Sequence, residues 1–487
     1  MKKLFLLICL CLCINAAATD GPDRFVVATS SGACPVLYDA GDASVVGKAA
    51  EMFAADLEAV CGVRPRMLTQ VGKCRSMVVV GSPQSTYIRQ LAEKGKLDIS
   101  ALDGRWESYM MKVVSRPFPG VDKALVLVGS DSRGAAYALM DISSSLGVSP
   151  WVWWCDVPVE RRSEAVVDII SGPSKEPSVK YRGIFINDED FGLDLWAADT
   201  YEPECKPIGP KTYSRICELL LRMKANHLLP AMHVGSVAFY SNPENKKVAG
   251  EYGIVIGTSH CEPLGYNNFV EWDKKINGEW SYRTNKEGIN SVLESRVLDC
   301  KDFENVYTIA LRGVHDYPMD FTSTQDEKTA MLQEAVADQR ALLEKHLGRP
   351  AEEIPQAFTP YKEVLNLYDN GLKLPEDITI IWPDDNYGYI KRLSNAEERK
   401  RPGRSGVYYH VSYHGKPHDY LWLCTTPPQL MYEELSKVYQ TGGDRIWLLN
   451  VGDIKPCEFA MEFFLDLAYD YDSFNFENVA TAHGDWL

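Results

Sequence analysis

Polar and ionisable side chains recur where eight short apolar runs of this sequence end, between residues 180 and 453. In chain order they are Asn187, Asp188, Glu189, Asp190, His233, His260, Glu262, Arg312, His315, Asp316, Lys362, Glu363, Asp384, Asp385, Asn386, Tyr409, His410, Tyr413, His414, Asn450 and Asp453. Carboxylates can exchange protons with a substrate, and the other groups can bind anions or hydroxyls. A lone Asp or Asn at such a junction is often a helix cap. So many ionisable groups in one place are costly unless they bind or react.

Three of the histidines raise the alternative of a metal-dependent hydrolase. His233, His260 and His410 follow different apolar runs and could meet in space. The H-x-H and H-E-x-x-H spacings typical of zinc sites are absent. The sequence therefore predicts no metal and no organic cofactor.

The apolar runs predict the strands of a (β/α)8 barrel. They cover residues 180–190, 227–233, 253–263, 306–316, 355–363, 378–386, 406–414 and 445–453. Most are followed by a stretch with helical spacing, and eight strand–helix units close into one barrel. Barrel enzymes place their chemistry at the carboxyl ends of the strands, which is where the polar groups lie.

The helical stretches are clearest at four places, residues 211–226, 327–348, 427–443 and 457–470. Residues 274–288 are expected to form a hairpin-like loop, and residues 475–487 a polar tail. Before the barrel, strand and helix patterns alternate over residues 21–172, which predicts a small α/β domain. A linker rich in Ser, Pro and Gly follows, and the barrel domain is expected over residues 179–487.

The first residues predict export from the cytoplasm. Residues 1–18 combine two lysines, an apolar core too short to span a bilayer, and an A-x-A cleavage site, which together indicate a signal peptide. No residue pattern typical of lipidation precedes the early cysteines, so a secreted or periplasmic protein is expected, without a membrane anchor. The later cysteines lack regular spacing and are expected to be buried thiols. The net charge of −16 and the absence of a basic block argue against nucleic-acid binding.

Several long motifs resemble glycoside hydrolase family 115. They are GSDSRGAAYALMDISSSLGVSPWVWWCDVPV in the first domain and residues 181–190, 257–263, 382–386, 406–413 and 450–456 in the barrel. The resemblance implies an α-glucuronidase. Such an enzyme releases glucuronic acid or its 4-O-methyl ether from xylan or related plant polysaccharides, with inversion. An inverting glycosidase needs one carboxylic acid for the leaving oxygen and one carboxylate to activate water.

The resemblance places the catalytic acid at Glu363 and the base at Asp316. In the segment Arg-Gly-Val-His-Asp, Val314 occupies one of the family's usual acidic positions. Asp384 and an acid of the 188–190 cluster therefore stay open as alternative bases.

The implied substrate is a plant polysaccharide or oligosaccharide that bears glucuronic acid. Arg312 could bind the sugar carboxylate with both arms of its guanidinium, although a structural ion pair with a strand-one carboxylate is the alternative. Tyr413 suits a sugar hydroxyl, although core packing is its alternative. The other residues expected to bind substrate are Asn187, Asp190, His233, His260, Asp384, Asn386, His410 and Asn450.

Family members usually continue beyond the barrel with further domains, and these are not found in the sequence. A glycan-binding relative with impaired catalysis is therefore the second hypothesis. A homodimer is left open.

Overall fold

The computed structural model describes residues 24–187, 189–205, 207–233, 235–319, 322–415, 423 and 425–487. The predicted signal peptide, residues 1–18, lies outside this part of the chain. The barrel strands are β9 (Tyr181–Phe185), β10 (His227–Leu229), β11 (Val255–Ile256), β12 (Tyr307–Thr308), β13 (Gln356–Phe358), β14 (Thr379–Pro383), β15 (Ser405–His410) and β16 (Ile446–Asn450). Seven lie inside their predicted runs and β15 begins one residue before its run, so the strand prediction is confirmed.

All pairs in this sheet are parallel, in the order β11-β10-β9-β16-β15-β14-β13-β12. A single parallel bridge between Ile256 and Asn305 joins the two outer strands and closes the barrel. The strands are buried on both faces, since helices cover them outside and apolar side chains such as Phe185 and Leu448 fill the interior. The predicted (β/α)8 barrel is confirmed.

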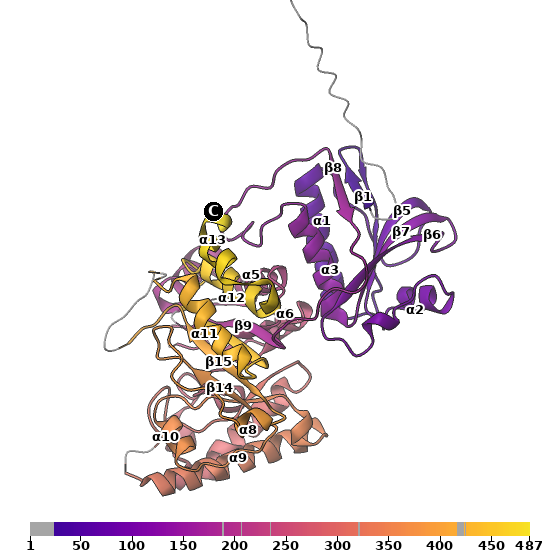
Figure 1. Ribbon diagram of the computed structural model, residues 1–487. Coiled ribbons are helices and arrows are strands. Elements are labelled where there is room, and N and C mark those ends of the chain that lie inside the picture. The colour runs from indigo at the N-terminus through magenta and orange to yellow at the C-terminus, as the bar shows by residue number, and fades with distance from the viewer. Residues whose placement is uncertain are drawn as a thin grey trace, which may run out of the picture.

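The helices of the barrel follow their strands. They are α5 (Pro210–Arg222), α6 (Pro243–Glu251), α8 (Tyr282–Cys300), α9 (Gln325–Leu347), α10 (Glu363–Asp369), α11 (Pro428–Gln440) and α12 (Glu458–Tyr469). The four clearest predicted helices correspond to α5, α9, α11 and α12. In Figure 1, α8 and α9 lie at the end of the molecule farthest from the indigo N-terminal part.

The hairpin-like loop predicted over residues 274–288 is wrong. Asp273 accepts a hydrogen bond from the Lys275 amide and starts the short helix α7 (Lys274–Asn277), and α8 begins at Tyr282. Ile289 and Leu293 are buried farther along α8, so its apolar face starts inside a stretch whose first residues are mostly polar.

The tail predicted over residues 475–487 is also a helix, α13 (Phe476–Trp486). The Asn475 side chain accepts from the amides of Glu477 and Asn478, and Asn478 accepts from the Asn475 amide. This capping box, together with the burial of the α13 residue Val479, stabilises a segment whose composition looks polar.

The N-terminal residues form two sheets and three helices. A three-stranded antiparallel sheet contains β1 (Arg24–Thr29), β2 (Gly32–Ala33) and β8 (Glu164–Asp168). A five-stranded sheet contains β3 (Val36–Leu37), β4 (Met67–Leu68), β5 (Cys74–Gly81), β6 (Tyr109–Ser115) and β7 (Val121–Gly129). The helices are α1 (Ser44–Cys61), α2 (Thr86–Glu93) and α3 (Ser132–Ser145). Helices α1 and α3 pack against α6 and α5 of the barrel, and Figure 1 shows them on the side of the sheets that faces it.

A buried carboxylate links these sheets to the barrel. Glu107 is fully buried, and its two oxygens accept from Arg133 Nε at 2.6 Å and Arg182 Nη2 at 2.5 Å. Asn226 donates a third bond at 2.8 Å. Burial opposes ionisation, but Arg182 and Arg133 hold the pKa of Glu107 below its ordinary value. Because Arg133 begins α3 and Arg182 lies in β9, one anion fixes the first barrel strand to the N-terminal part.

No disulfide joins the cysteines of the described ranges. Among the helices that the structure describes, none combines the length and the apolar character that a bilayer crossing needs.

The charge of Glu107 can be tested by substitution. Glu107→Gln leaves the buried guanidinium of Arg182 without its counter-ion and Arg133 with the exposed Glu304 alone, so we expect the free energy of unfolding to fall by about 3–5 kcal/mol in urea denaturation. Asp168→Asn is the control. It removes the exposed Arg24–Asp168 pair, for which a change below about 1 kcal/mol is expected. Equal effects of the two substitutions would contradict this role of Glu107.

Candidate active site

Arg312 lies at the centre of the charged groups that follow β11, β12 and β13. Its side chain is almost fully buried, and it donates to both oxygens of Glu363, with Nε to Oε1 at 3.1 Å and Nη2 to Oε2 at 2.8 Å. Its remaining arm, Nη1, donates to Asp316 Oδ1. The guanidinium therefore holds the two predicted catalytic carboxylates side by side. Among the described residues, Arg312 forms ion pairs with Asp316 and Glu363 and not with a carboxylate after strand one, which was the predicted alternative.

Asp316 has the most donors of any carboxylate in this cluster. It accepts from Arg312, from Lys362 Nζ and from His260 Nε2, the last at 2.9 Å. Burial and the positive charges of Arg312 and Lys362 hold the pKa of His260 well below its ordinary value. His260 is therefore a neutral imidazole at neutral pH, and its Nε2–H donates to Asp316.

Loops rather than strands give these side chains their direction. The main chain is left-handed at His315 and at Lys362, where φ is 55° and 51°. Neither residue is a glycine, so the surrounding contacts must hold these conformations. Asn268 provides one such contact, since its side chain donates to the Gly313 carbonyl and accepts from the His315 amide.

A second polar cluster joins the ends of β14 and β15. Asp384 and His410 are buried, and their Oδ1 and Nδ1 atoms lie 2.5 Å apart. Asp384 also accepts from the amides of Asn386, Gly388 and His410. With so many internal donors, Asp384 is well suited to orient the imidazole of His410.

The aromatic and amide groups predicted to bind sugar differ in how far they are open. Asn386 and Tyr413 are half-buried, and Asn386 accepts from the Tyr361 hydroxyl at 2.9 Å. Asn450 is fully buried, with its amide nitrogen bonded to the Tyr408 hydroxyl at 2.7 Å and its oxygen to the Gly452 amide. The sugar contact expected for Asn450 stays a prediction, and its observed bonds are internal.

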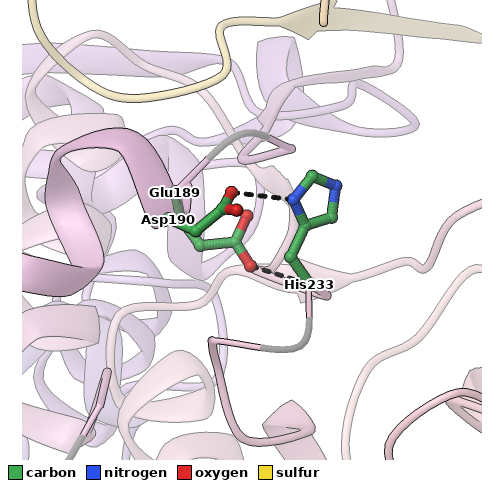
Figure 2. Close-up of side chains that lie close together, drawn as sticks. All are labelled: Glu189, Asp190 and His233. Carbon is green, nitrogen blue, oxygen red and sulfur yellow. Dashed lines mark hydrogen bonds and ion pairs between the residues drawn. The ribbon is translucent and has the colours of Figure 1, made fainter. Parts of the chain in front are cut away.

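A third cluster follows β9 and β10 (Figure 2). His233 Nδ1 lies 2.9 Å from Asp190 Oδ1, and the His233 amide donates to Glu189 Oε1 at 2.8 Å. Burial and the carboxylates of Glu189 and Asp190 raise the pKa of the nearby Asp194 to about 6. Asn187 is half-buried beside this cluster, and Asp188 lies outside the described residues.

The three histidines considered for a metal site do not meet. Each contacts a different carboxylate: Asp190 for His233, Asp316 for His260 and Asp384 for His410. In the part of the chain that the structure describes, the group with metal-ligand spacing consists of Glu189, Asp190 and His233.

One family of known enzymes matches most of the chain. The model of that family, Glycosyl hydrolase family 115, matches residues 174–487, which include all eight barrel strands and every predicted site residue. The chain belongs to glycosyl hydrolase family 115. The resemblance of its motifs to this family is thereby confirmed.

A solved structure resembles the family 115 chain over almost its whole length. BtGH115A, described as a novel family GH115 4-O-methyl-α-glucuronidase with specificity for decorated arabinogalactans, is 41% identical with a TM-score of 0.86. The match covers 96% of this chain and 59% of BtGH115A. CpGH84B, at 12% identity and a TM-score of 0.53 over 95% of this chain and 71% of its own, shares the fold alone. No curated protein sequence matches the family 115 chain.

Sequence reasoning named Lys362 and Glu189 at the strand ends without their contacts, and it missed two aromatic neighbours of the candidate site, Tyr361 and Tyr408. Lys362 and Glu189 stand beside predicted residues, but nothing in their positions shows that one pairs with Asp316 and the other is fully buried. Tyr361 and Tyr408 look like core aromatics in apolar runs. Their ring centroids lie 4.5 Å from His260 and 4.4 Å from His410.

The ionisation of Glu262, at the end of the third predicted strand, can be tested through the pH dependence of the free energy of unfolding. Burial raises its pKa from an ordinary 4.5 to about 8, with Glu271 and Glu189 adding to the shift and Arg296 opposing it. Between these two values the unfolded chain loses the proton and the folded chain keeps it. The stability that this proton provides is therefore present below pH 4.5 and is lost as the pH rises toward 8.

We therefore expect the free energy of unfolding to fall relative to Glu262→Gln by about 1.4 kcal/mol for each pH unit within that window. Glutamine keeps the acceptor for the Ser259 amide and has no proton to lose. Urea denaturation of both proteins at pH 5 and pH 8 measures the difference. A constant difference between them would show that Glu262 ionises normally.

Proposed function

We propose that this protein is an inverting glycoside hydrolase that releases glucuronic acid, or its 4-O-methyl ether, from the side chains of a plant polysaccharide. Membership of family 115 and the likeness to BtGH115A support this proposal. The observation that carries it is the cluster of Arg312, Glu363 and Asp316 at the strand ends. Decorated arabinogalactan, the specificity given for BtGH115A, is the first substrate to test, and glucuronoxylan the second.

Arg312 is the proposed receptor for the sugar carboxylate. Its guanidinium already binds Glu363 with two parallel hydrogen bonds, which is the geometry that a uronate would use. We infer that the uronate takes over these donors when it binds. Glu363 would then be released from its ion pair, and could carry the proton that the leaving oxygen requires.

Asp316 is the proposed base. Arg312, His260 and Lys362 all donate to it, and these hydrogen bonds favour the ionised carboxylate that a base must be before the reaction. A carboxylate of this kind can accept the proton of the attacking water. The alternative bases, Asp384 and the acids of the 188–190 cluster, stay open until variants are assayed.

The remaining polar side chains are proposed to hold the sugar. Asn187, Asn386 and Tyr413 are half-buried and suit hydroxyl groups. Because the one N–H of the neutral His260 ring donates to Asp316, His260 is proposed to accept from a sugar hydroxyl through Nδ1, and His410 is proposed to contact the sugar as well. For Asn450 we propose a supporting role, in which it fixes the hydroxyl of Tyr408.

We also propose that the protein is exported, to the periplasm or the medium. The charged, apolar and small-residue segments of residues 1–18 support this.

Two variants and two substrates can separate the catalytic roles. Glu363→Gln should lower kcat on the polysaccharide by about 10²–10⁴-fold, because the leaving oxygen must be protonated. On 4-nitrophenyl α-D-glucuronide, whose leaving group needs no proton, the same variant should stay within about tenfold of the wild type. Asp316→Asn should lose activity on both substrates, because water must be activated in either case.

The control is Glu334→Gln on the exposed face of α9, where Glu334 pairs with Lys286. Its activity should equal that of the wild type. Full polysaccharide activity in Glu363→Gln would contradict the assignment of the acid. Calorimetric binding of the oligosaccharide without turnover by the wild type would favour the glycan-binding hypothesis.

A further inference from the structure

The carboxylate of Glu189 is buried, and among the described residues hydrogen bonds satisfy only one of its two oxygens. The residue is fully buried, and its Oε1 accepts from the His233 amide and from Ser236 Oγ, each at 2.8 Å. Oε2 is buried as well and has no hydrogen-bond partner among the described residues. An unpaired, buried carboxylate oxygen is costly, and it normally indicates a group that something else satisfies.

The neighbours of this oxygen are also possible metal ligands. One ligand atom from each of Glu189, Asp190 and His233 lies within 4.8 Å of the other two. Figure 2 shows both carboxylates and the imidazole pointing toward one another. The residues come from two segments, since Glu189 and Asp190 follow β9 and His233 follows β10.

The charge of this cluster is unbalanced. Asp194 lies close by, where the main chain at Gly235 approaches it so tightly that a Cβ there would lie 2.4 Å from Asp194 Oδ2. Across the described part of the chain, no lysine or arginine forms an ion pair with Glu189, Asp190 or Asp194. The ion pair formed by Asp190 is with His233.

We propose that Glu189, Asp190 and His233 bind one divalent transition-metal ion, Mn²⁺ or Zn²⁺. Two carboxylates supply the oxygen ligands, and the imidazole nitrogen favours these ions over Ca²⁺ and Mg²⁺, which prefer oxygen alone. The distance of 2.9 Å between Asp190 Oδ1 and His233 Nδ1 is close to the separation of two ligand atoms on one metal ion. Adjacent ligands lie about 3.0 Å apart around an octahedral ion with bonds of about 2.1 Å, and about 3.4 Å apart around a tetrahedral one.

A cation here would tie the segment after β9 to the segment after β10. That is a positioning role, and the proposed glycosidic reaction uses no metal. The metal-binding proposal can therefore be tested independently of the proposed function. A proton is the competing occupant, because burial raises the pKa of the Glu189 carboxyl.

The test is isothermal titration calorimetry of the chelator-treated full chain with MnCl₂, ZnCl₂, CaCl₂ and MgCl₂ in separate runs, without sugar. We expect one equivalent of Mn²⁺ or Zn²⁺ to bind. Glu189→Gln and His233→Ala should each weaken that binding at least tenfold. Glutamine keeps an acceptor for the His233 amide and for Ser236, so the first variant preserves the bonds that hold the segment. Far-ultraviolet circular dichroism checks that both variants fold.

The matched control is His346→Ala, which removes an imidazole paired with Glu294 at 2.7 Å elsewhere on the molecule. Its affinity for the metal should not change. The proposal is overturned if the wild type binds neither Mn²⁺ nor Zn²⁺, which would leave the proton as the occupant. It is also overturned if folded Glu189→Gln and His233→Ala bind as tightly as the wild type, or if Ca²⁺ or Mg²⁺ binds in preference.

Discussion

The arrangement of the whole molecule depends on one buried anion, Glu107. Its carboxylate lies between Arg133 of α3 and Arg182 of β9, and all three side chains are shielded from water. In that environment neither an unpaired anion nor an unpaired cation is tolerable, so the three must meet in one geometry. Arg182 also donates to carbonyls at Val179 and Lys224, which fixes the start of the barrel. The N-terminal sheets thus set the position from which the first barrel strand runs toward the site.

At the other end of the strands, charge is organised in three carboxylate–imidazole pairs. Asp190 with His233, Asp316 with His260, and Asp384 with His410 each hold one ring in place. In the second pair the buried Arg312 also donates to the carboxylate, and that marks the proposed reaction centre. Ring contacts connect the groups, since His315 lies beside His233 and Tyr361 beside His260. A sugar bound at Arg312 would therefore contact side chains whose orientation is already fixed.

The sequence predicts this barrel well because strands buried on both faces are continuous apolar runs that end in polar residues. It also identifies the residues at the strand ends. Because the strands are parallel, these residues all lie on one side of the barrel. It does not predict which side chains pair. The positions of Asp316 and Glu363 relative to Arg312 depend on loops whose main chain is left-handed at His315 and Lys362. Nor does the polar composition of residues 475–487 predict α13, because that helix depends on the capping box at Asn475. The catalytic roles themselves stay predictions, since they depend on a bound sugar.

The closure of the barrel has a consequence for its dynamics. Strands β11 and β12 are two residues long, and one bridge with main-chain bonds around Ile256 joins them, helped by the hydroxyls of Thr258 and Thr308. Because β11 and β12 share so few amide hydrogen bonds, the barrel should open locally between them first. The amides of this seam should exchange with deuterium faster than those between β15 and β16. His260 follows one side of the seam and Asp316 the other, so each opening would pull at their hydrogen bond. The strand pair with the fewest hydrogen bonds, β11 and β12, is thus the one whose loops carry the proposed catalytic base and its histidine partner.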